Sequence, residues 1–366
     1  MATFKNKLRL LRGLLSGTAA RSAPAFVTVD ITNRCNLNCL CCRYHSPVLK
    51  SHSTGEDMPL GLFKDLCLEL KEMETELVIL EGEGEPFLHP EIEEFISTVT
   101  ELGFESMIFT NGTLLDESSC ERLAESRVGK LRVSLWAADS EEYASNHPGT
   151  SPEVFDGIVE NLRRMAEIKE RARGDFPKVE ICFPVHRENY HRIDSTIELA
   201  HAARCDGIYF SRLSPYRGAF SDYVVPAEER EMVRTAAQKA AERLESLEIR
   251  HNIGEFLRLF SVDQAEWLNL PCYIGWYHAR IKADGSVRAC NLTGLSMGSL
   301  KERGFREIWN GTPFREFREK SMRPGNQIFK EKHCDFDCCI HTVDNKRVHD
   351  VFRWFTPFVS WKKKFR

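Results

Sequence analysis

Three cysteines near the N-terminus have a spacing that can do chemistry. Cys35, Cys39 and Cys42 form a C-x3-C-x2-C pattern directly after the apolar run 25–31, which predicts a strand. Three thiolates on a short loop can hold three irons of a [4Fe–4S] cluster, whereas a cluster that only transfers electrons normally has four cysteine ligands. The fourth iron is then open to a small molecule. A zinc site is the alternative, but zinc prefers closed sites built from paired C-x2-C units.

Length and composition indicate one large domain followed by a small one. The chain has 366 residues, of which 42% are hydrophobic, enough for a sizeable core. It has no apolar run of about 18 residues, so we expect no transmembrane helix. Thirteen cysteines in a chain without a signal-peptide pattern favour metal ligands over disulfides. Most gather at 35–42 and 272–339, and Cys67, Cys120, Cys182 and Cys205 stand apart.

Charge is unevenly distributed along the chain. The net charge is −4, yet residues 1–25 carry five Lys or Arg and no acid, and residues 346–366 carry seven against Asp350. The acidic remainder argues against nucleic acid as a partner. Both basic ends also carry large apolar side chains, so they could lie on an anionic membrane surface, or form a packing helix and a solvated tail. We expect a cytoplasmic protein that could associate with a membrane through these ends.

Strand and helix patterns alternate from residue 26 onward. This alternation predicts an α/β fold with a parallel sheet and helices outside. Six such units suit a partial (βα)6 barrel of the TIM type, with its chemistry at the carboxyl ends of the strands. The expected strands are 26–31, 77–81, 106–110, 130–136, 178–184 and 207–213, and the expected helices are 59–74, 90–102, 116–126, 152–171, 191–204 and 226–247.

The second cysteine cluster lies in a module of short strands. Asp284-Gly285 predicts the turn of a hairpin that brings Cys272 and Cys290 together. The chain is therefore expected to divide into a basic amphipathic segment 1–25, a barrel 26–215, a helical linker 216–270, a small cysteine-rich α+β domain 271–345 and a basic aromatic tail 346–366.

The cysteine triplet after a first strand resembles the radical S-adenosylmethionine (SAM) superfamily. In that family SAM binds the open iron, and the reduced cluster cleaves it to a 5′-deoxyadenosyl radical that abstracts hydrogen from a substrate. The segment Gly82-Glu83-Gly84-Glu85-Pro86 resembles the family's Gly-Gly-Glu-Pro element, which binds the amino group of SAM. Glu83 stands where a second glycine is usual, so the resemblance leaves open which carboxylate reaches SAM.

The resemblance implies further SAM contacts on later strands. Asn111 ends the third strand in Thr-Asn-Gly, which the family often has there, although it fits a turn equally well. Ser134 would contact the ribose or carboxylate of SAM, or be a hydrogen-bonded core serine. Tyr209 and its neighbours would form a backbone bed for adenine. Cys41 departs from the family, which usually has an aromatic residue near adenine at that position.

The module 271–345 resembles the SPASM/twitch extension of the superfamily. A full SPASM domain holds two auxiliary clusters and needs more than the five cysteines present here. We therefore expect one auxiliary [4Fe–4S] cluster, with a structural zinc as the alternative. Its expected ligands are Cys272, Cys290, Cys334 and Cys338, with Cys339 as an alternate.

The resemblance implies an enzyme, with an external electron donor such as flavodoxin or ferredoxin. An auxiliary cluster could accept an electron from a substrate radical, which fits dehydrogenation. Strand periodicity turns Glu180 and Cys182 into the barrel, where the thiol could return hydrogen and epimerise the substrate, or be inert. Because only residues 1–25 precede the first strand, we expect no leader-binding domain and favour a small or carrier-linked, carbohydrate-like substrate. A peptide-modifying maturase and a non-catalytic iron–sulfur or zinc protein are the alternatives.

Overall fold

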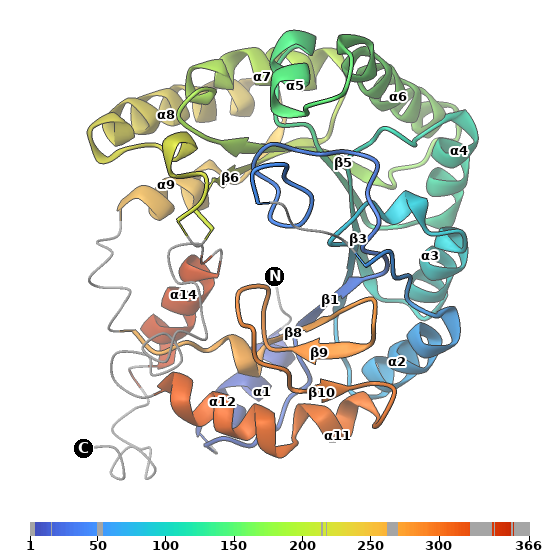
Figure 1. Ribbon diagram of the computed structural model, residues 1–366, viewed down its shortest axis with the longest axis vertical. Helices are drawn as coiled ribbons and strands as arrows, with labels where there is room; N and C mark the ends of the chain where they lie inside the picture. The colour runs from blue at the N-terminus through green and yellow to red at the C-terminus, as the bar shows by residue number, and fades with distance from the viewer. Residues whose placement is uncertain are drawn as a thin grey trace.

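The computed structural model shows a curved sheet of ten strands with helices on its outer side (Figure 1). The strand order is β10-β9-β8-β1-β2-β3-β4-β5-β6-β7, so β1 to β7 follow one another in chain order. All pairs from β1 to β7 are parallel, and β7 and β10 are the two edges. The expected partial TIM-type barrel is confirmed. The structure describes residues 4–15, 17–49, 54–213, 215–216, 218–261, 270–322, 339, 341–352 and 354.

The predicted strands and helices of the barrel begin and end within a few residues of their predicted bounds, and one further helix, Ser140–Asn146, was not predicted. Helix α6 illustrates the cause, because Phe155, Ile158 and Leu162 recur at helical spacing and are all buried against the sheet. The strands are β1 Phe26–Asp30, β2 Leu77–Glu81, β3 Glu105–Thr110, β4 Lys130–Ser134, β5 Lys178–Val185 and β6 Gly207–Arg212; the helices are α2 Leu60–Glu72, α3 Ile92–Glu101, α4 Glu117–Ser126, α5 Ser140–Asn146, α6 Pro152–Arg171 and α7 Ile193–Ala202.

The segment that we expect to be a linker also contributes to the barrel wall. After α8 (Arg230–Ser246), the short strand β7 (Arg250–His251) pairs in parallel with β6, and α9 (Ile253–Ser261) follows. The side chain of Asn252 prolongs the pairing, because it accepts a hydrogen bond from the Phe210 nitrogen (2.7 Å) and donates one to the Phe210 oxygen (2.8 Å). A strand of two residues has too little periodicity to be predicted from sequence.

The C-terminal module extends the barrel sheet on the side of β1. Strands β8 (His278–Ile281) and β9 (Ser286–Arg288) form the predicted hairpin, with Gly285 at a φ of 83° in its turn. Strand β8 also pairs in parallel with β1, which the sequence did not indicate (Figure 1). The module is thereby placed beside the strand that precedes the cysteine triplet. Its other elements are η5 Ile274–Trp276, β10 Gly298–Ser299, α11 Phe305–Trp309, α12 Thr312–Met322 and α14 Thr342–Phe352.

The N-terminal basic segment forms a packing helix. Helix α1 (Phe4–Leu15) buries Leu14, and the chain just after it contacts the C-terminal module, where the Trp276 indole donates to the Gly17 oxygen (3.3 Å). This contact supports packing of the segment rather than membrane binding. In the described part of the chain, no helix is long and apolar enough to cross a membrane.

Candidate active site

A cavity of about 360 Å³ opens at the carboxyl ends of β1 to β4. The cysteine loop follows β1, and the loops after β2, β3 and β4 form much of the wall, to which the C-terminal module adds Arg280, Asn291 and Leu292. Parallel strands bring these loops to one edge of the sheet although they are far apart in the sequence. The cavity is lined by nine residues that the sequence analysis assigned to it: Cys35, Cys39, Cys42, Gly82, Glu83, Gly84, Glu85, Asn111 and Ser134.

The three cysteines form a donor set that fits an iron–sulfur cluster. Burial is the main factor that raises the pKa of each thiol, that of Cys35 to about 11, and the charge of Cys42 raises the pKa values of Cys35 and Cys39 further. Thiolates so arranged need a cationic partner, which a cluster supplies. The backbone nitrogens of Tyr44 and His45 both donate to the Cys42 sulfur (3.3 Å each), as hydrogen bonds to cluster sulfurs do.

The glycines of the Gly82–Pro86 segment allow the second loop to pack against the cysteine loop. A Cβ on Gly84 would overlap the backbone of Arg34, and one on Gly82 would lie 2.6 Å from the Thr32 oxygen. The Glu85 nitrogen donates to the Arg34 oxygen (2.7 Å), which fixes the approach. The two glycines are therefore required by backbone contact, whereas the position of Glu83 between them tolerates a side chain.

The Glu85 carboxylate connects the second and third loops. It accepts hydrogen bonds from the Phe87 nitrogen (3.1 Å), the Thr110 hydroxyl (2.7 Å) and the Asn111 nitrogen (2.6 Å). Burial raises the pKa of Glu85 to about 7, although these three donors oppose the rise. The Asn111 amide also donates to Asn36 in the cysteine loop (2.9 Å). Hydrogen bonds from the protein therefore fix the position of the Glu85 carboxylate.

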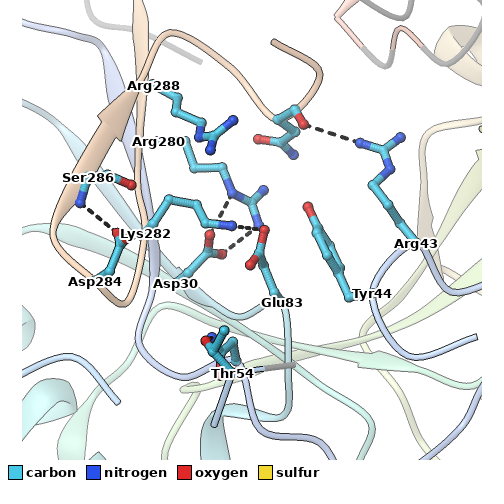
Figure 2. A network of polar contacts seen from close by, with 12 residues as sticks. Asp30, Arg43, Tyr44, Thr54, Glu83, Arg280, Lys282, Asp284, Ser286 and Arg288 are labelled. Carbon is cyan, nitrogen blue, oxygen red and sulfur yellow. Dashed lines mark hydrogen bonds and ion pairs between the residues drawn. The ribbon is translucent and has the colours of Figure 1, made fainter. Parts of the chain in front are cut away.

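Basic residues from β8 and the segment after it neutralise the acidic groups beside the cavity. The buried Arg280 guanidinium binds both oxygens of Asp30 (2.8 and 2.5 Å) and one of Glu81 (2.7 Å). Lys282 forms an ion pair with Glu83 (Figure 2). Neither base was predicted from the sequence. Their spacing of two residues at a hairpin strand, which puts both side chains on one face of the sheet, is the signal that could have indicated them.

Two predicted site residues do not line this cavity. The Tyr209 ring packs on the Arg132 guanidinium at 3.7 Å. Cys182 is buried, and its thiol is hydrogen-bonded to the side chains of Ser134 and Ser211. Burial raises the pKa of this thiol. Glu180 does face Arg132 (2.6 Å), so it shares the inner polar layer as predicted, but as an ion-pair partner. Alternation gives the face of a strand residue, not its depth along the barrel, so it did not indicate that these two side chains stop short of the cavity lining. The roles expected for Cys182 and Tyr209 stay predictions.

Aromatic residues do line the cavity, both from the cysteine loop, which contributes Tyr44, and from other segments. Cys41 is at the wall, with its pKa raised to about 12 by burial and by the nearby Glu188. Trp136, after β4, lines the same cavity and has a left-handed backbone (φ 61°), which is rare for a bulky side chain. Strained residues of this kind concentrate at ligand sites. Sequence reasoning missed Trp136 because its strain appears only in the backbone.

The second cysteine cluster lies in the C-terminal module. Cys272, Cys290 and Cys339 are buried from solvent sufficiently to raise their pKa values, and Cys339 interacts electrostatically with the other two. The Leu292 nitrogen donates to the Cys290 sulfur (3.4 Å) and the Asn345 amide to that of Cys272 (3.7 Å). The expected ligands Cys334 and Cys338 lie outside the described residues, whereas the alternate, Cys339, lies with the predicted pair.

Comparison with known proteins defines the class. The family model of the radical SAM superfamily matches residues 29–200, and that of the iron–sulfur cluster-binding SPASM domain matches residues 272–339. The chain belongs to the radical SAM superfamily and has a C-terminal SPASM domain. It is therefore a radical SAM enzyme that binds SAM, a [4Fe–4S] cluster and an auxiliary cluster.

Individual relatives extend over most of the chain. It is 28% identical to an AdoMet-dependent heme synthase of Methanosarcina barkeri, over 84% of this chain and 88% of that protein. It is 24% identical to a PqqA peptide cyclase of Granulibacter bethesdensis, over 82% and 78%. The fold resembles that of Streptococcus suis SuiB bound to its precursor peptide SuiA, with a TM-score of 0.67 at 16% identity, over 92% of this chain and 75% of that one.

Proposed function

We propose that this enzyme uses a 5′-deoxyadenosyl radical to modify a peptide. The observation that carries the radical step is the convergence of Cys35, Cys39 and Cys42 with the Gly82–Glu85 loop on one cavity. A cluster held there supplies the electron that cleaves SAM. The chain's own residues hold the ligand set, close the loops around it and exclude water.

The peptide substrate is supported by sequence similarity to the PqqA peptide cyclase. Neither relative compared above is named for a carbohydrate, so the carbohydrate-like, carrier-linked substrate that we expected has no support from them. Cys182, which would return hydrogen in an epimerisation, is enclosed by two serines instead of lining the cavity. A peptide therefore replaces the sugar as the leading candidate.

A heme precursor is the second candidate. The AdoMet-dependent heme synthase has the higher identity of the two relatives and covers a larger share of this chain. Both candidates require the same radical step and differ only in what enters the barrel. They can be separated by one substrate experiment.

The radical step is tested with anaerobically reconstituted protein. We expect about eight irons per chain, four per [4Fe–4S] cluster, and release of 5′-deoxyadenosine from SAM with dithionite. Cys35→Ala, Cys39→Ala and Cys42→Ala should each abolish release, because each removes a cluster ligand. Cys67→Ala is the matched control, since Cys67 is buried in α2 away from the cavity. Full SAM cleavage by the three ligand variants would refute the radical step.

The substrate class is tested with extracts of the source cells. Fractions are added to the reconstituted enzyme, and 5′-deoxyadenosine is measured above the substrate-free rate. We expect stimulation that protease treatment destroys. Stimulation that survives protease but not periodate would overturn the peptide in favour of a carbohydrate, and stimulation that follows porphyrin absorbance would favour the heme precursor.

A further inference from the structure

Arg43 lies between the two cysteine clusters. It follows Cys42 directly in the sequence, and its Nη1 donates to the backbone oxygen of Asn291 (3.2 Å), the residue after Cys290 (Figure 2). Its guanidinium also lies 4.4 Å from the centre of the Tyr216 ring, in the loop after β6. One side chain therefore connects the cysteine loop, the C-terminal module and the far side of the barrel.

Within the described residues, no carboxylate pairs with Arg43. Its contacts in the described part of the chain are a carbonyl oxygen and an aromatic ring, and none of the ion pairs there includes it. The neighbouring bases differ, because Arg280 is paired with Asp30 and Glu81. Arg43 is half-buried at the cavity wall, where charges are screened less than on the open surface.

The field of this charge acts on both cysteine clusters. Arg43 is the residue next to Cys42, and it binds the backbone of the residue next to Cys290, so its charge is placed beside one ligand of each cluster. A cation that favours a thiolate also favours the extra negative charge of a reduced cluster, because both interactions are Coulombic. The reduction potential of an iron–sulfur cluster depends on nearby charge, hydrogen bonds and exposure. One residue is thus placed to act on two potentials.

We propose that Arg43 is a positioning residue shared by the two iron–sulfur sites, which joins their loops and raises the reduction potential of both clusters. A higher potential makes the SAM-site cluster easier for an external donor to reduce. It also makes the auxiliary cluster a better acceptor for the electron of a substrate radical. The proposal rests on the two clusters and does not depend on the substrate.

Three variants separate the charge of Arg43 from its hydrogen bond. Arg43→Lys keeps the charge, Arg43→Gln keeps a donor for the Asn291 oxygen without charge, and Arg43→Met removes both. Arg204→Met is the matched control, because Arg204 is exposed and bound to Glu170 on the outer surface. Iron content and the SAM-induced change in the electron paramagnetic resonance (EPR) signal confirm that each variant holds its clusters.

The readout is an EPR-monitored redox titration of both clusters, with only dithionite and mediators added. The auxiliary cluster is also titrated alone, in a background with Cys35, Cys39 and Cys42 replaced by Ala. We expect Arg43→Gln and Arg43→Met to lower both midpoint potentials, and Arg43→Lys and the control to stay near wild type. The proposal is wrong if Arg43→Gln, with full iron content, moves neither potential or only one. Loss of SAM cleavage with unchanged potentials would also overturn it, yet leave the proposed radical step intact.

Discussion

At the scale of single residues, Glu83 shows how one local departure from the family pattern is compensated. A glycine at this position would need no partner, whereas the glutamate brings a charge to the cavity wall. Lys282 supplies the opposite charge, and its ammonium also lies 5.6 Å from the centre of the Tyr44 ring. Both partners are mostly enclosed, so removing one leaves a poorly solvated charge.

We predict that Lys282→Met destabilises the protein and that a second change at Glu83 restores it. The unpaired carboxylate should cost about 1–2 kcal/mol, less than a fully buried pair because both side chains retain some water contact. Glu83→Gln in the Lys282→Met background should recover most of this loss. The measurement is anaerobic urea unfolding of the four proteins of the cycle. A loss in the double variant equal to the sum of the two single losses would show that the pair is not coupled.

At the scale of elements, buried polar groups join the strand-end loops to one another and to β8. Glu85 joins the loops after β2 and β3, and Arg280 joins β8, β1 and β2. Such groups are strongly coupled in a medium of low polarity. The cavity is therefore assembled only when all of these elements are in place.

Glu85 should also make the stability of these loops depend on pH. Its folded pKa of about 7 is above its ordinary value of 4.5, so the folded state binds the extra proton between these pH values. The stability of wild type relative to Glu85→Gln should fall by up to about 3 kcal/mol as pH rises from 4.5 to 7, and then level off. Paired thermal unfolding of both proteins across this range measures the difference. If the stability of wild type relative to Glu85→Gln instead rose with pH, the folded-state pKa of Glu85 would be lowered and not raised.

At the scale of the whole molecule, Arg318 connects the N-terminal segment to the C-terminal module. It is fully buried and donates to the backbone oxygens of Gly275 (2.7 Å), Trp309 (2.8 Å) and Thr18 (3.1 Å). The ring of Trp309 also covers its guanidinium, 4.6 Å from the ring centre. Its planar fork reaches three separate segments at once, which a lysine cannot do.

Arg318→Met should therefore destabilise the protein by about 3–5 kcal/mol, because it leaves two buried carbonyl oxygens and a half-buried one without a donor. The stability of Arg318→Lys should lie between that of Arg318→Met and that of wild type. Urea unfolding measures the loss, and limited proteolysis should show faster cleavage after α1. Arg204→Met serves as the surface control, with an expected change within about 0.5 kcal/mol. A similarly small effect of Arg318→Met would mean that water replaces the lost donor.

The sequence alone determined the class of chemistry and most of the barrel. Cys35, Cys39 and Cys42 could be assigned together because their spacing is local, and strands such as β5 could be predicted because their periodicity is local. The hairpin turn at Gly285 could be predicted for the same reason, because the Asp-Gly pair is local. These features depend on neighbours within a few residues, and such neighbours are visible in the chain itself.

Only the tertiary structure decided which groups complete the site. The pairing of β8 with β1 brings Lys282 to Glu83 across 199 residues of sequence, and the Arg43 contact spans 248. The tertiary structure also leaves Cys182 and Tyr209 out of the cavity lining, because the depth of a side chain along the barrel axis depends on barrel geometry. Long-range pairing follows from how whole elements pack, and no spacing within one segment encodes it.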